Sequence, residues 1–312
     1  MNELAPICLF TYNRIEETIQ TVSALKKNYL AKESDLIIFS DGHKDESTKK
    51  KVTEIRNYLK TVTGFKTVKI KESEINKGLA NSIIHGVSEV IYKYGKTIVL
   101  EDDLITTPNF LNFMNQALDF YKDDDTIQSI NGFSLKINNP ENIYFHKRTF
   151  PWGWATWKNV WSQRLFDKDY IQNKITDNPK LLKKFNKICG NDMASMLQDS
   201  MSGVNSSWYV RWVFNHFSNN KYSVYPTLSK VVNIGFMYES THCNGINTYI
   251  SELDNKFNMS FTFVKLKELD KDMNKEFLRY FKKSYKLFFR IGLLKNLYGR
   301  KLLINEIKRK FF

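Results

Sequence analysis

Cysteine is scarce in this chain, and the few cysteines are far apart. The 312 residues include only three, Cys8, Cys189 and Cys243, and none of them forms a Cys-x-x-Cys pair. An odd number of widely separated cysteines argues against a disulfide framework and a structural zinc site, and indicates a reducing compartment. The 42% hydrophobic content is that of an ordinary globular protein. The length allows one large α/β domain or two smaller ones.

Long apolar runs are also missing. The best late candidate, residues 285–298, is interrupted by Lys286, Arg290 and Lys295, whereas a membrane-spanning helix needs roughly 20 consecutive apolar residues. The N-terminal segment has no basic stretch, and the apolar residues after it end at Arg14. We therefore expect no secretory signal and no transmembrane helix, and predict a cytoplasmic protein.

Acidic residues are outnumbered, and the excess of positive charge lies at the C-terminus. The chain has 47 Lys and Arg against 33 Asp and Glu, a net charge of +14, of which residues 277–312 contribute +10 and residues 1–276 only +4. Apolar residues at helical spacing accompany the basic ones, which favours amphipathic helices on an anionic membrane surface. A basic helix packed on the main domain is the alternative. Nucleic-acid binding is not expected, because the rest of the chain is nearly balanced.

The first 135 residues alternate between strand-like and helix-like patterns. Strands separated by helices require right-handed crossovers, so this alternation predicts an α/β fold with a parallel, doubly wound sheet. Beyond Gly132 the pattern becomes irregular and rich in tryptophan. The short apolar runs that predict strands are 6–11, 36–40, 65–70 and 96–100, and the amphipathic stretches that predict helices are 16–27, 46–59 and 79–94.

These patterns suggest how the chain is divided. We expect one domain over residues 1–265, in which 1–135 binds the ligand and the aromatic-rich part, 136–265, completes the site. A basic amphipathic helical tail, 266–312, follows it.

Three consecutive carboxylates, Glu101-Asp102-Asp103, directly follow the predicted strand 96–100. Ligands bind at the carboxyl ends of strands in such sheets. Adjacent carboxylates repel unless a cation lies between them, and Mg²⁺ or Mn²⁺ combines carboxylates with phosphate oxygens. The position therefore predicts a metal–diphosphate site, with a helix cap or a solvated loop as the alternative. A second triple, Asp123-Asp124-Asp125, follows a helix and is predicted to lie in a solvated turn.

The chain resembles nucleotide-sugar glycosyltransferases of the GT-A fold, whose Asp-x-Asp (DXD) motif follows a strand in this way. It looks like bacterial polysaccharide enzymes related to glycosyltransferase family 2. A more distant resemblance is to the N-acetylglucosaminyltransferase I family, which carries the same Glu-Asp-Asp-Leu. The resemblance implies a Rossmann-like, mostly parallel sheet. The matching segments, within about residues 5–245, are 10–14, 40–42, 76–79, 99–104, 150–154, 207–208 with 211–212, and 233–236 with 241–243.

The resemblance implies a donor site at the strand ends. Thr11 and Arg14 would lie against the nucleotide, Asp41 would accept a hydrogen bond from the base, and Lys77 would face a phosphate. Arg14 and Lys77 could instead be solvated surface cations, and Asp41 could be only a turn residue.

The resemblance also implies a divalent cation, Mn²⁺ or Mg²⁺. Asp102 would face the ribose or the metal, and Asp103 would bind the metal, which neutralises the diphosphate leaving group. His242 would bind the metal or donate to phosphate. A buried, hydrogen-bonded histidine is the alternative for His242.

The acceptor side is less well defined. Trp152 and Trp154 are candidates for an aromatic floor under the acceptor, although they could equally be core residues. An inverting transferase needs a general base, usually Asp or Glu. The Ser-Trp element at 207–208, where relatives often place one, has no acidic residue nearby. Asp199 and Glu239 are the candidate bases in place of such a residue. Each could instead be a solvated surface carboxylate.

The resemblance thus implies a metal-dependent hexosyl- or N-acetylhexosaminyltransferase, inverting, that uses a nucleotide-diphosphate sugar, with a UDP-sugar as the first expectation. The acceptor would be a surface glycan or a lipid-linked saccharide, reached from the inner face of the plasma membrane through residues 277–312. A sugar nucleotidyltransferase is an alternative, disfavoured because residues 8–14 lack glycine. A non-catalytic polyanion- or membrane-binding module is another, which explains the tail but not the carboxylates.

Overall fold

The structure is a computed structural model that describes residues 3–236 and 246–311. Along the chain the elements are β1 (Ile7–Thr11), α1 (Ile15–Lys26), β2 (Asp35–Ser40), α2 (Glu46–Leu59), β3 (Thr67–Glu72), α3 (Gly78–Tyr94), β4 (Lys96–Glu101), β5 (Leu104–Thr106), α4 (Phe110–Phe120), β6 (Ile127–Asn131), β7 (Ile143–His146), β8 (Trp154–Trp157), α5 (Lys168–Asp177), α6 (Leu181–Cys189), α7 (Met193–Ser202), α8 (Trp208–Ser218), β9 (Tyr222–Pro226), β10 (Val231–Asn233), α9 (Lys271–Arg279), α10 (Lys283–Leu293) and α11 (Leu297–Phe311).

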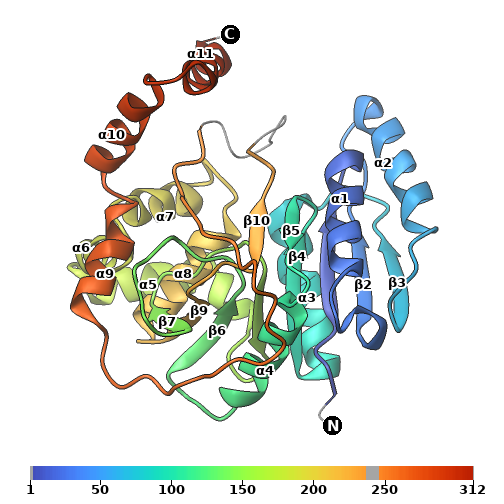
Figure 1. Ribbon diagram of the computed structural model, residues 1–312, viewed down its shortest axis with the longest axis horizontal. Helices are drawn as coiled ribbons and strands as arrows, with labels where there is room; N and C mark the ends of the chain where they lie inside the picture. The colour runs from blue at the N-terminus through green and yellow to red at the C-terminus, as the bar shows by residue number, and fades with distance from the viewer. Residues whose placement is uncertain (1–2, 237–245, 312) are drawn as a thin grey trace.

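A mostly parallel sheet runs through the centre of the molecule (Figure 1). Its strand order is β3-β2-β1-β4-β8-β6-β9-β7. Strands β3, β2, β1 and β4 are parallel, and β8 is antiparallel to both of its neighbours, β4 and β6. A separate two-stranded antiparallel sheet joins β10 to β5, directly after the carboxylates that follow β4. The predicted α/β class, with the Rossmann-like sheet of the GT-A fold, is confirmed.

Side chains of the parallel strands alternate between two buried layers. Ile7 and Leu9 of β1 belong to a core shared with α1, α2 and α4, whereas Cys8 and Phe10 pack with α3 and with tryptophans of the second half. Because successive side chains of a strand point to opposite faces, a strand buried on both sides must be apolar throughout. All five residues of β1 are buried. This explains why short uninterrupted apolar runs predicted these strands within a few residues.

The aromatic-rich half extends the same sheet. Strands β7, β8 and β9 come from residues 143–226 and complete the side of the sheet beyond β4. Helices α5 to α8 pack on one another around a separate apolar cluster that includes Phe185 and Phe214. The tryptophan at the start of β8, Trp154, stacks between Trp161 and Trp208. Much of the tryptophan-rich sequence therefore forms core.

The C-terminal segment begins in the core and ends outside it. On α9, Phe277 is fully buried and stacks on His146 with ring centroids 3.7 Å apart. Phe281 lies against the Arg148 guanidinium at 3.6 Å. Beyond it, α10 has no buried residue, and Figure 1 shows α10 and α11 standing away from the body of the molecule. None of the helices in the described residues could cross a membrane, because none combines sufficient length with sufficient apolarity.

Two buried histidines should make the stability of the fold depend on pH. Burial lowers the pKa of His146 to about 3 and that of His216 to about 4, from 6.5. Between these values and 6.5 the unfolded chain binds more protons, so stability falls as the pH decreases below about 6.5. Each histidine contributes about 1.4 kcal/mol per pH unit in that window.

His146→Asn tests this, because the amide oxygen can still accept the backbone N–H of Arg148, which the His146 ring accepts now. Urea unfolding at pH 6 and pH 4.5 should show a smaller loss of stability in the variant than in the wild type. An equal loss in both proteins would contradict the assignment.

Candidate active site

Three neighbouring strand ends bring the predicted donor residues together. Thr11 ends β1, Asp41 follows β2, and Asp102 and Asp103 follow β4, with β1 between the other two strands. The backbone N–H of Asp41 donates to the Thr11 carbonyl at 3.1 Å, and the N–H of Tyr12 donates to the Asp102 carboxylate at 3.3 Å. The parallel register therefore creates the cluster.

Arg14 binds both aspartates. Its guanidinium donates one hydrogen bond to Asp102 and another to Asp103, the latter at 3.0 Å. The side chains of Arg14, Asp102 and Asp103 are 18%, 5% and 12% exposed, so all three are largely desolvated. Arg14 lies just before α1, and no side-chain capping bond holds it there. Its long side chain is thus available to the carboxylates.

The carboxylates lie in an environment that disfavours their charge. Burial, together with the negative charge of Asp103, raises the pKa of Glu101 to about 8 and that of Asp102 to about 6, although Arg14 opposes both shifts. Burial alone would lower the pKa of Arg14, but the two aspartates raise it above its ordinary value. One arginine only partly compensates three adjacent acids, so a further positive charge would be stabilised here.

A second segment lies against Asp103. The Asp103 carbonyl accepts the backbone N–H of Ile234 at 2.9 Å, next to the pairing of β10 with β5. Gly235 follows, and its N–H donates to the Asn233 side chain at 2.8 Å. A Cβ at Gly235 would collide with the Asp103 carboxylate. The glycine therefore lets the backbone approach this acid closely.

Asp41 holds the loop that leads to α3. Its carboxylate accepts the backbone N–H groups of Gly42, Lys77 and Gly78, each at 2.9 Å. A side chain on Gly42 would collide with the backbone of Ile75, which explains the Asp-Gly pair. A carboxylate has about four acceptor positions, so a nucleotide base could use only what these three bonds leave.

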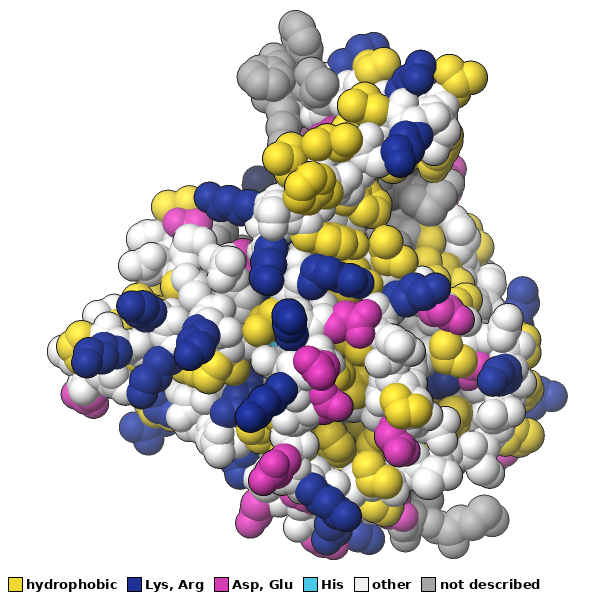
Figure 2. Space-filling view, turned by 60° about the vertical axis from the view of Figure 1, so that its left-hand side comes forward, with side chains coloured by type: hydrophobic (Ala, Val, Ile, Leu, Met, Phe, Trp, Pro, Cys, Tyr) yellow, Lys and Arg dark blue, Asp and Glu magenta, His cyan; other side chains and the backbone are white. Residues whose placement is uncertain are grey.

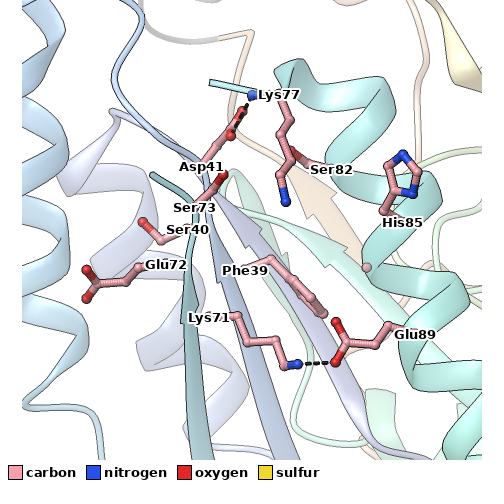
Figure 3. Close-up of a pocket in the computed structure, with 11 residues that line it drawn as sticks. Phe39, Ser40, Asp41, Lys71, Glu72, Ser73, Lys77, Ser82, His85 and Glu89 are labelled. Atoms are coloured by element: carbon pink, nitrogen blue, oxygen red, sulfur yellow. Dashed lines mark hydrogen bonds and ion pairs between the residues drawn. The ribbon is translucent and has the colours of Figure 1, made fainter. Parts of the chain in front are cut away.

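A small pocket of about 110 Å³ opens beside Asp41 (Figure 3). The Lys77 side chain points into it from the start of α3, while Ser82 and His85 line one side. An ion pair between Lys71 and Glu89 lies at its far end. The pocket thus offers cationic, carboxylate and hydroxyl groups next to the predicted donor site.

The remaining predicted residues are not part of this cluster. Asp199 is exposed on α7, and no hydrogen bond or ion pair in the described part of the chain joins its side chain to Asp102 or Asp103. Trp152 is 8% exposed and packs against Phe133 and Phe236. Trp154 is 1% exposed and enclosed by other indoles, so it offers no ring face to an acceptor. Glu239 and His242 lie outside the described residues.

The carboxylates fit part of a cation site. Within residues 3–236 and 246–311, no group of three or more His, Cys, Asp or Glu side chains is arranged to hold a metal ion. Mg²⁺ and Mn²⁺ commonly take one or two carboxylates and complete their shell with water and substrate phosphate. Asp102 and Asp103 can supply those carboxylates, and Arg14 now lies between them.

A comparison of the first 187 residues with known protein families identifies the family of this chain. Residues 7–187, more than half of the chain, match the family described as Glycosyl transferase family 2. The chain belongs to this family. The match includes the strand ends that carry Thr11, Asp41 and the β4 carboxylates. The resemblance to the N-acetylglucosaminyltransferase I family and the bacterial source stay predictions.

Solved structures resemble this chain distantly. One is a mannosyltransferase, PcManGT from Pyrobaculum calidifontis in complex with GDP-Man and Mn²⁺, with 8% identity, a TM-score of 0.35, and coverage of 51% of this chain and 46% of that one. Another is residues 1–349 of TarS from S. aureus, with 9% identity, a TM-score of 0.42, and coverage of 74% and 61%. The chain thus spans less than two thirds of either structure. No curated protein matches it significantly.

Sequence reasoning missed two contributors to the site. The Tyr12 backbone binds Asp102, and Gly235 gives Asp103 room. Both lie in segments that carried the family resemblance. A contact made by a backbone N–H cannot be predicted from the type of the residue, because nearly every residue has this group. The glycine in 233–236 was the one available signal.

Removing the arginine should destabilise the protein. Arg14→Gln leaves two largely buried carboxylates without their cation, and we expect a loss of about 3 kcal/mol in the free energy of unfolding. Urea denaturation measures it. Lys49→Gln is the matched control, because its ion pair with Glu46 is exposed and should contribute less than about 1 kcal/mol. Equal effects of the two substitutions would contradict the importance of the Arg14 pair.

Proposed function

We propose that this protein is a glycosyltransferase that moves a sugar from a nucleotide-diphosphate donor to a surface-glycan or lipid-linked saccharide acceptor, with a divalent cation. The supporting observation is the pair of largely buried aspartates after β4, beside Arg14 and the ends of β1 and β2. A UDP-sugar is the expected donor, and the group moved would be a hexosyl or N-acetylhexosaminyl unit.

The donor would lie along the strand ends. Arg14 presents a planar set of donors suited to phosphate oxygens. It could therefore release one of its two aspartates and bind the diphosphate instead. Lys77 would add a positive charge from the start of α3. Thr11 would line the nucleotide, and Asp41, which already orders the loop before α3, would accept from the base through its free acceptor position.

Asp103 is the proposed metal ligand, with Asp102 facing the ribose or the metal and His242 as a further ligand. These are hard oxygen and imidazole donors, which suits Mn²⁺ or Mg²⁺. When bound, the cation would neutralise the developing charge on the diphosphate leaving group. Gly235 would keep the Asp103 carboxylate where it lies now.

The acceptor would enter from the aromatic-rich half, residues 136–265. Trp152 contacts Phe236, with ring centroids 5.6 Å apart, and Phe236 follows the glycine that lies against Asp103. Trp152 is therefore the proposed acceptor-side aromatic. Trp154, enclosed in the core, would act only by holding β8 in place.

A thermal-shift titration tests the donor site. The melting temperature should rise with one of UDP, GDP, CMP or dTDP only when Mn²⁺ is present, because a ligand that binds only the folded state stabilises it. Asp103→Asn should abolish this metal-dependent shift.

Asp123→Asn is the matched control, since it changes an exposed acid of the triple after α4. It should keep the full shift. If no nucleotide shifts the wild type, or if Asp103→Asn shifts as the wild type does, the proposed donor site is wrong.

The proposed inverting reaction also needs a general base. Asp199 and Glu239 are the two proposed carboxylates, and replacing the true base should lower kcat about 10²–10⁴-fold. The rates of single-turnover transfer by Asp199→Asn and Glu239→Gln should therefore differ from each other by that factor. Both variants should keep the nucleotide-dependent thermal shift. If both retain full activity, neither residue is the base.

A further inference from the structure

An apolar stripe along α10 and the residue that caps it has no partner in the described part of the protein. Leu287, Phe288 and Ile291 of α10 and the capping residue Leu294 are 58%, 69%, 49% and 52% exposed. They lie on one side of the helix because residues three and four apart share a face. We call these four residues the docking stripe. Leu297 and Tyr298, at the start of α11, continue it and are 75% and 70% exposed.

Basic residues border the docking stripe. Lys283 and Lys295 are exposed at its two ends, and Lys286 is half-buried on the same helix. The single acid of residues 282–312, Glu306, pairs with Arg290 across the α10–α11 turn. Figure 2 shows hydrophobic side chains gathered on the projecting part of the molecule, with Lys and Arg side chains around them.

The two helices are tied to the side of the molecule that carries the site. The Tyr285 hydroxyl donates to the Thr248 carbonyl at 3.4 Å, and Glu306 accepts the backbone N–H of Ile246 at 3.4 Å. In Figure 1, α10, α11 and the end of β10 lie at the same end of the molecule, opposite the N-terminus. The end of β10 leads to Gly235, which lies against Asp103.

We infer that α10 and the start of α11 dock on an anionic lipid bilayer, with the docking stripe among the acyl chains and the lysines at the headgroups. Charge complementarity selects this partner: an exposed apolar stripe with a basic border matches a negatively charged interface. A helix packed on the domain would bury its apolar side, as α9 does with Phe277. Docking in this way would turn the site end of the molecule toward the lipid surface.

The inference refines the predicted tail. Residues 277–281 belong to the core, because Phe277, Tyr280 and Phe281 are at most 2% exposed. The lipid-binding part therefore starts after Phe281. Lipid binding does not depend on the proposed reaction, so the two can fail separately.

Vesicle co-sedimentation of the full chain tests the surface. The protein should sediment with vesicles of phosphatidylcholine plus phosphatidylglycerol, far less with phosphatidylcholine alone, and less as salt is added. The double variant Phe288→Asp/Ile291→Asp should bind these vesicles at least about tenfold more weakly, a loss of about 1.4 kcal/mol or more in binding free energy. Lys283→Gln/Lys295→Gln should reduce the dependence on phosphatidylglycerol.

Matched controls lie elsewhere on the surface. Val204→Asp/Met259→Asp changes two exposed apolar residues, 78% and 57% exposed, outside α10 and α11, and should bind vesicles as the wild type does. All variants should keep the wild-type melting temperature and nucleotide-dependent shift. Equal binding by the Phe288→Asp/Ile291→Asp variant, or equal binding to neutral vesicles, would overturn the inference. A dimer that this variant dissociates, without any vesicle binding, would instead identify a second copy of the chain as the partner.

Discussion

Arg14 is the cation on which the arrangement of the site depends. Three consecutive acids at the end of a buried strand repel one another, and the guanidinium between Asp102 and Asp103 offsets much of that repulsion. This pairing requires β1 to lie beside β4, so that the turn after β1 reaches the carboxylates. The Thr21 hydroxyl, on α1, also donates to the Asp102 carbonyl at 2.8 Å. The geometry of the acids therefore depends both on the position of α1 and on the register of the central strands.

In the proposed function the same residues would serve both as a structural contact and as a ligand site. A divalent cation beside Asp103 would take over the neutralising role that Arg14 has in the protein alone. The arginine would then be free for the negative charge that arrives with a diphosphate. Such a site would have the charge of its acids partly compensated before and after the ligand binds, which a site with acids alone would not.

Much of the fold could be predicted from the sequence, because buried parallel strands are apolar throughout. The helix predicted at 46–59 agrees with α2 residue for residue, and the four predicted strands agree with β1 to β4 within two residues at every end. The acids after β4 were distinguished from the exposed 123–125 triple by their position after a buried strand. The bonds from Asp41 to the backbone of Lys77 and Gly78, and the close approach of Gly235 to the Asp103 carboxylate, could not be predicted, since they join segments distant in sequence. The burial of Trp154 and Phe277 likewise depends on tertiary packing, which composition does not reveal.

The chain also separates two kinds of apolar surface that look alike in sequence. Phe277 and Phe288 both lie in basic, amphipathic segments, yet one stacks on His146 in the core and the other is 69% exposed. The difference follows from what each helix meets: α9 lies over β7 and β9, where aromatic rings are available, whereas α10 extends past the edge of that core. A bilayer would supply the missing apolar environment. If the acceptor is held in the same bilayer, docking would raise its effective concentration at the site without any additional contact between enzyme and acceptor.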